Sequence, residues 1–196
     1  MQAARCDTGA GGVGVAKGAC QAEQPRPLLR IVGMQIEVVV EIPKGTRNKY
    51  EADESGAIWL DRTLFTATQY PEDYGFVPHT MAEDGDPLDV MVILQEPTFP
   101  GCHIHARPIG VFRMRDEEGT DAKVLCVPAT DPRTSRITEL DHVEDYVLDE
   151  IAHFFEIYKA LEPGKSTEPG GWQHRHAAER AIDEAREMYA KRRPPA

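Results

Sequence analysis

An acidic cluster stands near the middle of the chain, where Glu83, Asp84, Asp86 and Asp89 fall within seven positions and lead into an apolar run. Two carboxylates about 4 Å apart repel each other by roughly 4 kcal/mol at an effective dielectric of about 20. Such groups must be protonated, separated by solvent or neutralised by a cation. Oxygen donors of this kind suit Mg²⁺, Mn²⁺ or Ca²⁺ better than zinc. The cluster therefore indicates a divalent-cation site, although a solvated acidic turn also explains the motif taken alone.

The motif does not fit the calcium-binding loop of sensor proteins. That loop requires Asp or Asn and then Gly where Leu88 and Asp89 stand here, and a bidentate Glu where Gln95 stands. The sequence therefore excludes a calcium sensor loop at this segment.

Composition favours one folded domain whose charged partners are cations, or anions that arrive with cations. The 196 residues carry a formal net charge of −11, which argues against duplex nucleic acid or an anionic membrane as a partner, because both bind clustered Lys and Arg. The cysteines show no C-x-x-C spacing, so neither a zinc site nor a disulfide framework is indicated. No apolar run approaches the roughly 18 residues of a membrane span, and no secretory signal is evident. We therefore expect a soluble, cytoplasmic protein.

The first 33 residues differ in pattern from the remainder. They are rich in Gly, Ala and Gln, and they show neither strand alternation nor a helical apolar stripe. We expect residues 1–33 to form a disordered extension and residues 34–196 to form the functional domain. Met34 is a candidate for the true initiator, and a targeting or partner-binding arm is the alternative interpretation of the extension.

The part after Met34 is predicted to be largely β. Alternate positions from Ile36 to Ile42 are apolar, which predicts a strand with Glu41 on its opposite face. Gly, Pro and Asp turn signals separate the further strand-like runs. These runs are Ala57–Arg62, Leu88–Leu94, Pro108–Arg115 and Lys123–Val127.

Two amphipathic helices are predicted in the last third of the chain. Apolar residues recur at steps of three and four from Val147 to Leu161, and Pro163 and Gly164 end this helix. A second helix is predicted from about Gln173 to Lys191. Five strands followed by two helices favour an α+β, mainly β fold. We expect a five-stranded OB-like barrel, closed or partly closed, with two C-terminal helices packed outside.

The acidic cluster resembles the signature of the family I (soluble) inorganic pyrophosphatases, bacterial type, which Asp84 to Val90 match in residue type and spacing. Other segments match the same family in order along the chain. They are Glu41–Pro43, Asn48–Glu51, Leu60–Arg62, Tyr70–Gly75, Asp116–Lys123, His153–Phe155, Tyr158–Lys159, Leu161–Lys165 and Trp172. The resemblance implies that residues 34–196 form an inorganic pyrophosphatase domain, which hydrolyses diphosphate to two orthophosphates.

The resemblance also implies a set of metal ligands and a general base. Asp84, Asp89 and Asp121 would hold the tightest metal, and a water held between it and a second metal would attack the substrate in line, without a covalent intermediate. Metal coordination lowers the pKa of water from about 15.7 to about 7, and Asp86 would accept the proton. Several Mg²⁺ ions per active site are implied, with Mn²⁺ or Zn²⁺ as substitutes. The positions implied to hold the metal that enters with substrate are Glu41, Glu51 and Asp116.

A set of basic and hydroxyl side chains is implied to bind and neutralise the phosphates. Arg offers a planar fork and Lys a point charge, and both suit the charged oxygens of phosphoryl transfer. The residues are Lys49, Arg62, Tyr74, Lys123, Tyr158 and Lys159. Tyr158 and Lys159 are expected in the last turn of the first helix, where a cation also complements the helix dipole. Each basic residue taken alone is better explained as a surface charge, and only their order along the chain favours a site.

Several other features are ambiguous in the sequence. His103 and His105 would share one face of an extended segment, which is a ligand-like spacing, but surface positions are the favoured interpretation. His153 is expected in packing or in a subunit contact, and Tyr70 in packing or in an accessory role at the site. The stretch Ser166–Gly171 is expected to be a mobile loop between the helices.

The predicted ligand is pyrophosphate as its magnesium complex, which would let an acidic protein accept a highly anionic substrate. The resemblance also implies a homohexamer. Two other classes of function stay open at this point. One is a barrel that binds single-stranded nucleic acid, which would need a basic groove with interleaved aromatic side chains. The other is a non-catalytic divalent-cation module, and neither alternative would release phosphate from pyrophosphate.

Overall fold

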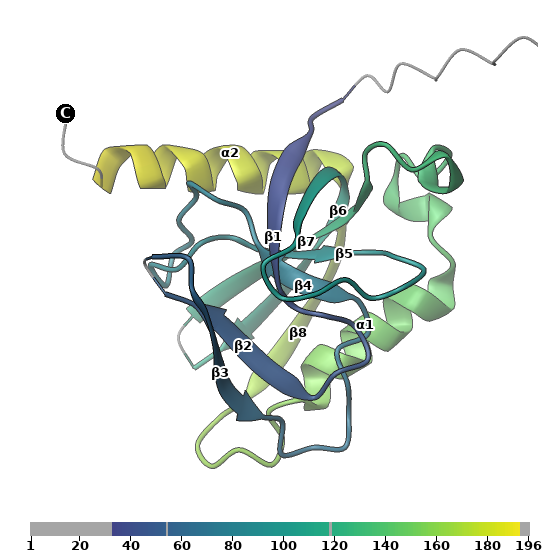
Figure 1. Ribbon diagram of the computed structural model, residues 1–196. Coiled ribbons are helices and arrows are strands. Elements are labelled where there is room, and N and C mark those ends of the chain that lie inside the picture. Colours follow the sequence, from purple (N-terminus) through teal and green to yellow (C-terminus); the bar gives the residue numbers. More distant parts are fainter. Residues whose placement is uncertain (1–32, 54, 118, 193–196) are drawn as a thin grey trace, which may run out of the picture.

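The computed structural model describes residues 33–53, 55–117 and 119–192. Five strands form a closed ring at the centre of the fold (Figure 1). In ring order the strands are β1 (Ile36–Ile42), β4 (Asp73–Phe76), β5 (Asp89–Val92), β7 (Gly119–Pro128) and β6 (His103–Asp116). Pairing of β1 with both β4 and β6 closes the ring. β5 and β7 run parallel, and the other neighbours in the ring are antiparallel. The expected five-stranded barrel is confirmed.

The first strand has the predicted alternation. The even-numbered residues from Ile36 to Ile42 are buried, whereas Glu37 is exposed and Glu41 is half-buried on the other face. Because side chains alternate across a strand, the apolar row enters the core and Glu41 is left free to face the candidate site.

Two hydrophobic clusters occupy opposite faces of the barrel wall. Along β7, Val124 and Cys126 join one cluster, and Leu125 and Val127 join the other. Both faces of this strand are therefore buried, which explains its continuous apolar run.

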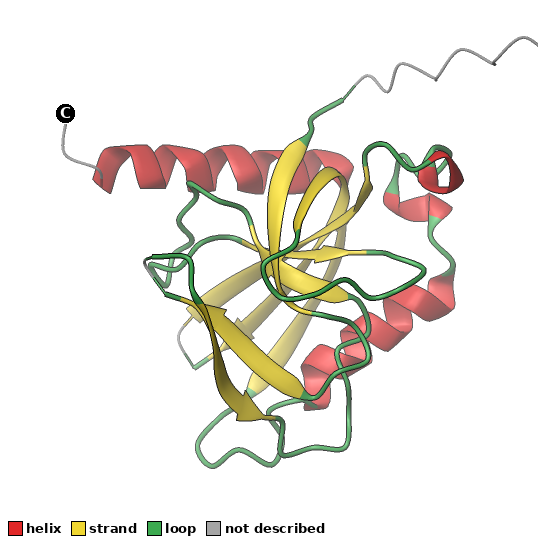
Figure 2. Ribbon diagram, viewed as in Figure 1, coloured by secondary structure: helices red, strands yellow, loops and turns green. Residues whose placement is uncertain are grey.

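The two helices lie outside the strands, on different sides of the barrel (Figure 2). Helix α1 (Asp145–Ile157) contributes Ile151, Phe154 and Phe155 to the cluster that contains Leu125. Helix α2 (Arg175–Arg192) contributes Ala178 and Ile182 to the cluster that contains Val124. The structure thus confirms two helices packed outside the barrel.

One predicted strand lies elsewhere than expected. The run predicted at Ala57–Arg62 forms β3 (Ile58–Thr63), which pairs with β2 (Asn48–Ala52) in a separate two-stranded sheet, hereafter the ribbon. The fifth strand of the barrel is instead the short β4, which the sequence analysis did not predict. Most of β3 is exposed, so its apolar residues are a poor guide to its place in the fold.

The fit of β4 against β1 depends on Gly75. A Cβ at this position would lie 1.9 Å from the backbone oxygen of Val39, closer than any side-chain carbon can approach. Only glycine therefore allows Tyr74 and Phe76 to take their places beside the first strand.

The expected loop at Ser166–Gly171 is wrong. Residues Thr167–His174 form β8, which pairs antiparallel with the outer edge of β6. The strand contains Pro169 and two glycines, and a Cβ at Gly170 would approach the carbonyl oxygen of Arg113 to 2.9 Å. Gly and Pro therefore occur here in an irregular edge strand whose backbone lies close to that of β6, and not in a flexible connection.

The end of the first helix also differs from the prediction. Helix α1 ends at Ile157, and Tyr158 is its C-cap. Lys159 lies in the turn beyond, where the Glu162 amide donates to the Lys159 carbonyl oxygen at 2.8 Å. Tyr158 and Lys159 are therefore presented by a helix end and the turn that follows, rather than by regular helix.

Residues 1–32 lie outside the described chain, and with them most of the expected N-terminal extension. The helices of the described part include none that is both long enough and apolar enough to cross a membrane.

Candidate active site

Lys123, in β7, stands at the centre of the candidate site with its side chain 3% exposed. Its Nζ donates to Asp89 Oδ2 at 2.7 Å, to Asp121 Oδ2 at 2.8 Å and to the Tyr74 hydroxyl at 2.9 Å. The Tyr74 hydroxyl donates in turn to Asp89. Parallel pairing of β5 with β7 places Asp89 directly opposite Lys123, so the sheet itself brings these groups together.

The electrostatics of this group favour a charged lysine and a protonated tyrosine. Burial tends to lower the pKa of Lys123, but Asp89, Tyr74 and Asp121 outweigh it and hold this pKa well above its usual value. Burial raises the pKa of Tyr74 well above its usual value, and the charge of Asp89 adds to the rise. Burial also raises the pKa of Asp121, against the opposing charge of Lys123. Lys123 and Tyr74 are therefore both hydrogen-bond donors at neutral pH.

A second cation lies next to this group, at the far end of β6. Lys159 Nζ donates to Asp116 Oδ2 at 2.8 Å and lies 3.5 Å from Glu117 Oε1. Burial tends to lower the pKa of Lys159, whereas Tyr158 and Asp116 raise it above its usual value. The same Tyr158, which is buried, interacts electrostatically with Lys123 as well. Tyr158 thus interacts electrostatically with both lysines.

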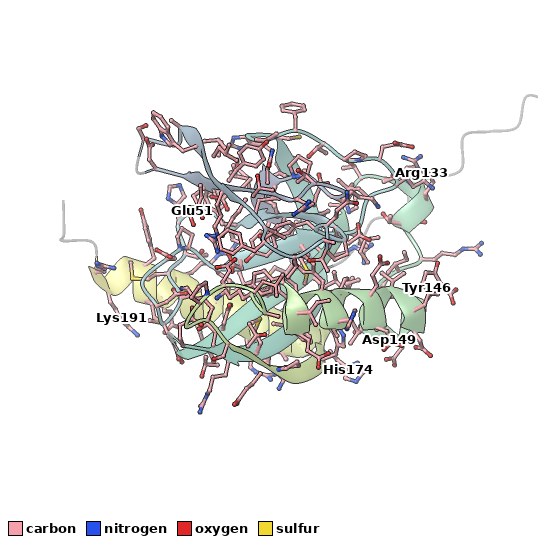
Figure 3. The ribbon with its side chains drawn as sticks, turned by 90° about the horizontal axis from the view of Figure 1, so that it is seen from below. Glu51, Arg133, Tyr146, Asp149, His174 and Lys191 are labelled. Atoms are coloured by element: carbon pink, nitrogen blue, oxygen red, sulfur yellow. The ribbon has the colours of Figure 1, made fainter. Side chains whose placement is uncertain are left out.

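The ribbon supplies a second pair of cations. Lys49 in β2 faces Arg62 in β3, and the carboxylate of Asp61 contacts both, at 3.6 Å from Lys49 Nζ. Lys49 also pairs with Glu51, whose side chain is 57% exposed. Figure 3 shows Glu51 on the ribbon, well apart from Tyr146 on the outer side of α1.

Glu41 connects the ribbon with the barrel. Its Oε1 accepts a hydrogen bond from the Ala52 amide at 2.7 Å. Burial raises the pKa of Glu41 to about 7 against the Ala52 hydrogen bond, and the charge of Asp89 contributes to the rise while Lys49 opposes it. Glu41 therefore interacts with the acidic group on β5 and with the cations of the ribbon.

Asp84 and Asp86 lie in the turn between β4 and β5, and both are exposed. The Asp86 amide donates to Asp84 Oδ1 at 2.9 Å. The structure thus gathers Asp89, Asp121 and Lys123 tightly, whereas Asp84 and Asp86 lie in the exposed turn that leads into β5.

Comparison with known proteins shows the family of this chain. Residues 38–190 match the family profile described as inorganic pyrophosphatase. The chain is 60% identical over 151 residues to the inorganic pyrophosphatase of Streptomyces coelicolor, covering 76% of this chain and 93% of that protein. This chain belongs to the inorganic pyrophosphatase family.

Solved structures of the family share the fold. The crystal structure of the inorganic pyrophosphatase from Thermus thermophilus is 44% identical in sequence, with a TM-score of 0.78, covering 84% of this chain and 97% of that chain. The enzyme from Helicobacter pylori is 40% identical with the same TM-score, covering 80% of this chain and 94% of that chain. The resemblance to family I pyrophosphatases inferred from the motifs is confirmed.

Inorganic pyrophosphatases of this family are metal-dependent, and the carboxylates of the candidate site are the side chains here that could bind a metal cation. In the part of the chain that the structure describes, no three His, Cys, Asp or Glu side chains stand together as metal ligands. Lys123 and Lys159 pair with carboxylates of the candidate site. The candidate donors are all carboxylate oxygens, and burial together with the charge of neighbouring carboxylates raises the pKa values of Glu41 and Asp121. Such a partly buried, oxygen-only, negatively charged set fits a hard cation such as Mg²⁺.

Three residues in contact with predicted pyrophosphatase site residues had been given no role from sequence. Asp61 contacts Lys49 and Arg62, Glu117 contacts Lys159, and Glu162 contacts Arg62. All three lie inside the matched motifs, directly beside a predicted site residue or three positions from one. Their closeness in sequence to predicted site residues was the only signal for them, and sequence alone cannot show which carboxylate pairs with which Lys or Arg.

The ambiguous residues lie away from this site or beneath it. His103 lies on the outer face of the barrel, where its Nδ1 is 2.6 Å from Glu37 Oε1, and His105 is exposed on the same strand. Tyr70 is buried and packs against Tyr74 and Phe154. His153 is 66% exposed on α1, so it does not pack in the core of the described chain.

Proposed function

We propose that this chain hydrolyses inorganic pyrophosphate to two orthophosphates in a magnesium-dependent reaction. One observation carries the proposal: in a chain of this family, Lys123 lies buried between Asp89 and Asp121. In that arrangement the Lys123 ammonium, which could bind phosphate oxygens, lies directly beside the Asp89 and Asp121 carboxylates, which could bind metal. Mg²⁺ and pyrophosphate would together balance both sets of charge.

Six carboxylates are proposed to hold the metal. Asp84, Asp89 and Asp121 would form the tightest site, and the residues that would support metal entering with the substrate are Asp116, Glu41 and Glu51. Bound divalent cations would make a coordinated water more acidic and neutralise charge on the phosphates. Among these carboxylates, burial raises the pKa of Glu41 to about 7, so a cation bound beside it would favour its ionised form.

The chain's own donors are proposed to hold and neutralise the phosphates. Lys123 and Tyr74 already act as donors toward Asp89, and these donors would be available to phosphate oxygens once the carboxylates engage metal. The other donors in this role are Lys49, Arg62, Tyr158 and Lys159. Positioned positive charge of this kind is the main demand that phosphoryl transfer makes on a protein.

Asp86 is proposed as the general base that accepts the proton of the attacking water. Its exposed position in the turn before β5 gives it access to solvent, and the hydrogen bond from its backbone N–H to Asp84 Oδ1 restrains that turn. Attack in line on the phosphorus would then release orthophosphate without a covalent enzyme intermediate.

A phosphate-release assay with pyrophosphate tests this proposal. We expect release that requires Mg²⁺ and falls by a factor of about 10² or more in Asp86→Asn, while circular dichroism and the melting temperature stay unchanged. Asp141→Asn, at an exposed position beside His174, is the matched control and should retain full activity. No release from the wild-type chain with Mg²⁺ would refute the proposal and favour a nucleic-acid-binding barrel or a non-catalytic cation module.

The magnesium, the homohexamer and the cytoplasmic location stay predictions. Analytical ultracentrifugation tests the hexamer. Activity with Mg²⁺, Mn²⁺ and Zn²⁺ at equal free concentration tests the metal.

A further inference from the structure

The ribbon forms a sheet of its own. Within the described residues, β2 and β3 pair with each other and share no strand ladder with the six-stranded sheet. The place of Lys49 and Arg62 over the barrel must therefore be set by loops and side-chain contacts. One such contact is the Glu41 carboxylate on the Ala52 amide, at the end of β2 that is distant from Arg62.

A second contact holds the other end of the ribbon, between Arg62 and Glu162. Arg62 Nε lies 3.2 Å from Glu162 Oε1, and Arg62 Nη2 lies 2.9 Å from Oε2. The Glu162 side chain is only 8% exposed, and that of Arg62 is 27% exposed. This is a two-point contact between residues 100 positions apart, and such a fork restrains both the position and the plane of a guanidinium.

Glu162 is itself held in the segment that presents Lys159. Its amide donates to the Lys159 carbonyl oxygen at 2.8 Å, and its own carbonyl accepts from the Lys165 amide at 3.3 Å. Lys159 in turn holds Asp116 at the end of β6. One short segment after α1 therefore connects the arginine of the ribbon with the lysine at the barrel end.

We infer that Glu162 is a positioning residue that sets the Arg62 guanidinium for the substrate phosphate. Its carboxylate occupies the Nε side of the guanidinium, and the Nη1 donors, which contact Asp61 here, point elsewhere. Arg has five N–H donors in a fixed fork, so with Glu162 on one edge a phosphate oxygen would take the Nη1 end, in place of Asp61. This inference rests on the proposed function, since it assigns Arg62 to the phosphate of pyrophosphate.

The test compares Glu162→Gln with Glu156→Gln, a matched change at an exposed position near the end of α1. We expect Glu162→Gln to raise the KM for magnesium pyrophosphate about tenfold with kcat changed less than about threefold, because a charged hydrogen-bonded contact that orients a binding group is lost. Calorimetry should show orthophosphate binding weakened by a similar factor. Glu156→Gln should match wild type in both measurements.

A double-mutant cycle separates positioning from general support of the fold. In an Arg62→Lys background, which cannot form the same fork, Glu162→Gln should change KM by less than about twofold. Equal fold-changes in both backgrounds, or a lowered melting temperature with unchanged KM, would overturn the inference. If the wild-type chain released no phosphate at all, the proposed function would fail instead, and the orthophosphate measurement would still decide whether Glu162 acts through Arg62.

Discussion

The Asp89 carboxylate accepts a hydrogen bond from Lys123 Nζ at 2.7 Å, across a parallel pair of strands in which these two residues stand directly opposite each other. The pairing register of β5 and β7 therefore fixes a metal-ligand candidate and a phosphate-ligand candidate against each other. In the absence of a metal cation, the Lys123 ammonium balances the charge of the Asp89 carboxylate. We expect this contact to contribute to the stability of the metal-free protein as well as to the site.

Replacement of Lys123 by Met should expose that dual role. The change leaves Asp89 and Asp121 without their shared cation, and we expect the free energy of unfolding without metal to fall by about 3 kcal/mol, since breaking a buried charge pair leaves an uncompensated charge. Mg²⁺ should restore part of this loss, although activity stays low. Urea denaturation with EDTA and with Mg²⁺ measures both effects. Lys191→Met, at an exposed helix position, should change stability by less than about 0.5 kcal/mol under either condition.

The raised pKa of Glu41 predicts an unusual pH dependence for the metal-free protein. Its folded pKa is about 7 against a reference of 4.5, so between these values the folded chain binds a proton that the unfolded chain has lost. Stability due to this group is therefore largest at acid pH and falls as pH rises from about 4.5 to about 7. Saturating Mg²⁺ should remove that fall, because the cation stabilises the ionised carboxylate.

Glu41→Gln isolates this effect. We expect urea denaturation in EDTA to show a smaller loss of stability between about pH 5 and pH 7 in this variant than in wild type, since the amide does not ionise. Glu96→Gln, at an exposed loop position, should keep the wild-type slope. Identical slopes in all three proteins would contradict the assignment of the titration to Glu41.

Gly75→Ala should be strongly destabilising. A Cβ would lie 1.9 Å from the Val39 backbone oxygen, and two paired strands would have to separate to accept it. We expect a loss of about 3 kcal/mol or more in the free energy of unfolding and lower activity, because Tyr74 lies on the displaced strand. Gly33→Ala, where an added Cβ would have no neighbour within 4 Å in the described chain, should be neutral by urea denaturation.

The barrel and its first strand were predictable because the pattern was local. From Ile36 to Ile42 the alternation of residue types along the sequence matches the alternation of buried and less buried side chains. β4 gave no such signal, because it has only four residues and contains Gly75. The ribbon strand β3 was predicted as a strand but assigned to the barrel, because β-propensity does not encode the partner of a strand.

The candidate site residues were chosen from family motifs, which could not indicate the contacts between them. The spacing from Asp84 to Asp89 marked the acidic cluster, yet nothing in it shows that Lys123 stands between Asp89 and Asp121. Likewise, Glu162 lies far along the chain from Arg62. Pairings of this kind arise from strand register and tertiary packing, which one sequence does not display.

The turn that joins the two strands of the ribbon depends on Asp53. Its Oδ1 accepts from the Ser55 amide at 2.9 Å and the Ala57 amide at 3.1 Å, and its Oδ2 accepts from Trp59 Nε1 at 2.8 Å. These hydrogen bonds, led by those from the Ser55 and Trp59 side chains, lower the pKa of Asp53 from 3.8 to about 2. The contribution of Asp53 to the turn is therefore complete above about pH 4 and is lost as pH falls toward about 2.

Asp53→Ala should release this turn at neutral pH. We expect the indole N–H of Trp59 and the amide of Ala57 to exchange with solvent about tenfold faster or more in NMR measurements, because their shared acceptor is gone. Wild type should approach the same behaviour only below about pH 3, as the carboxylate protonates. Since the ribbon also carries Lys49 and Arg62, KM should rise by about twofold to threefold. Unchanged exchange at Trp59 would mean that the turn is held by the strand ladder of β2 and β3 instead, and the predicted acid sensitivity of the ribbon would then be wrong.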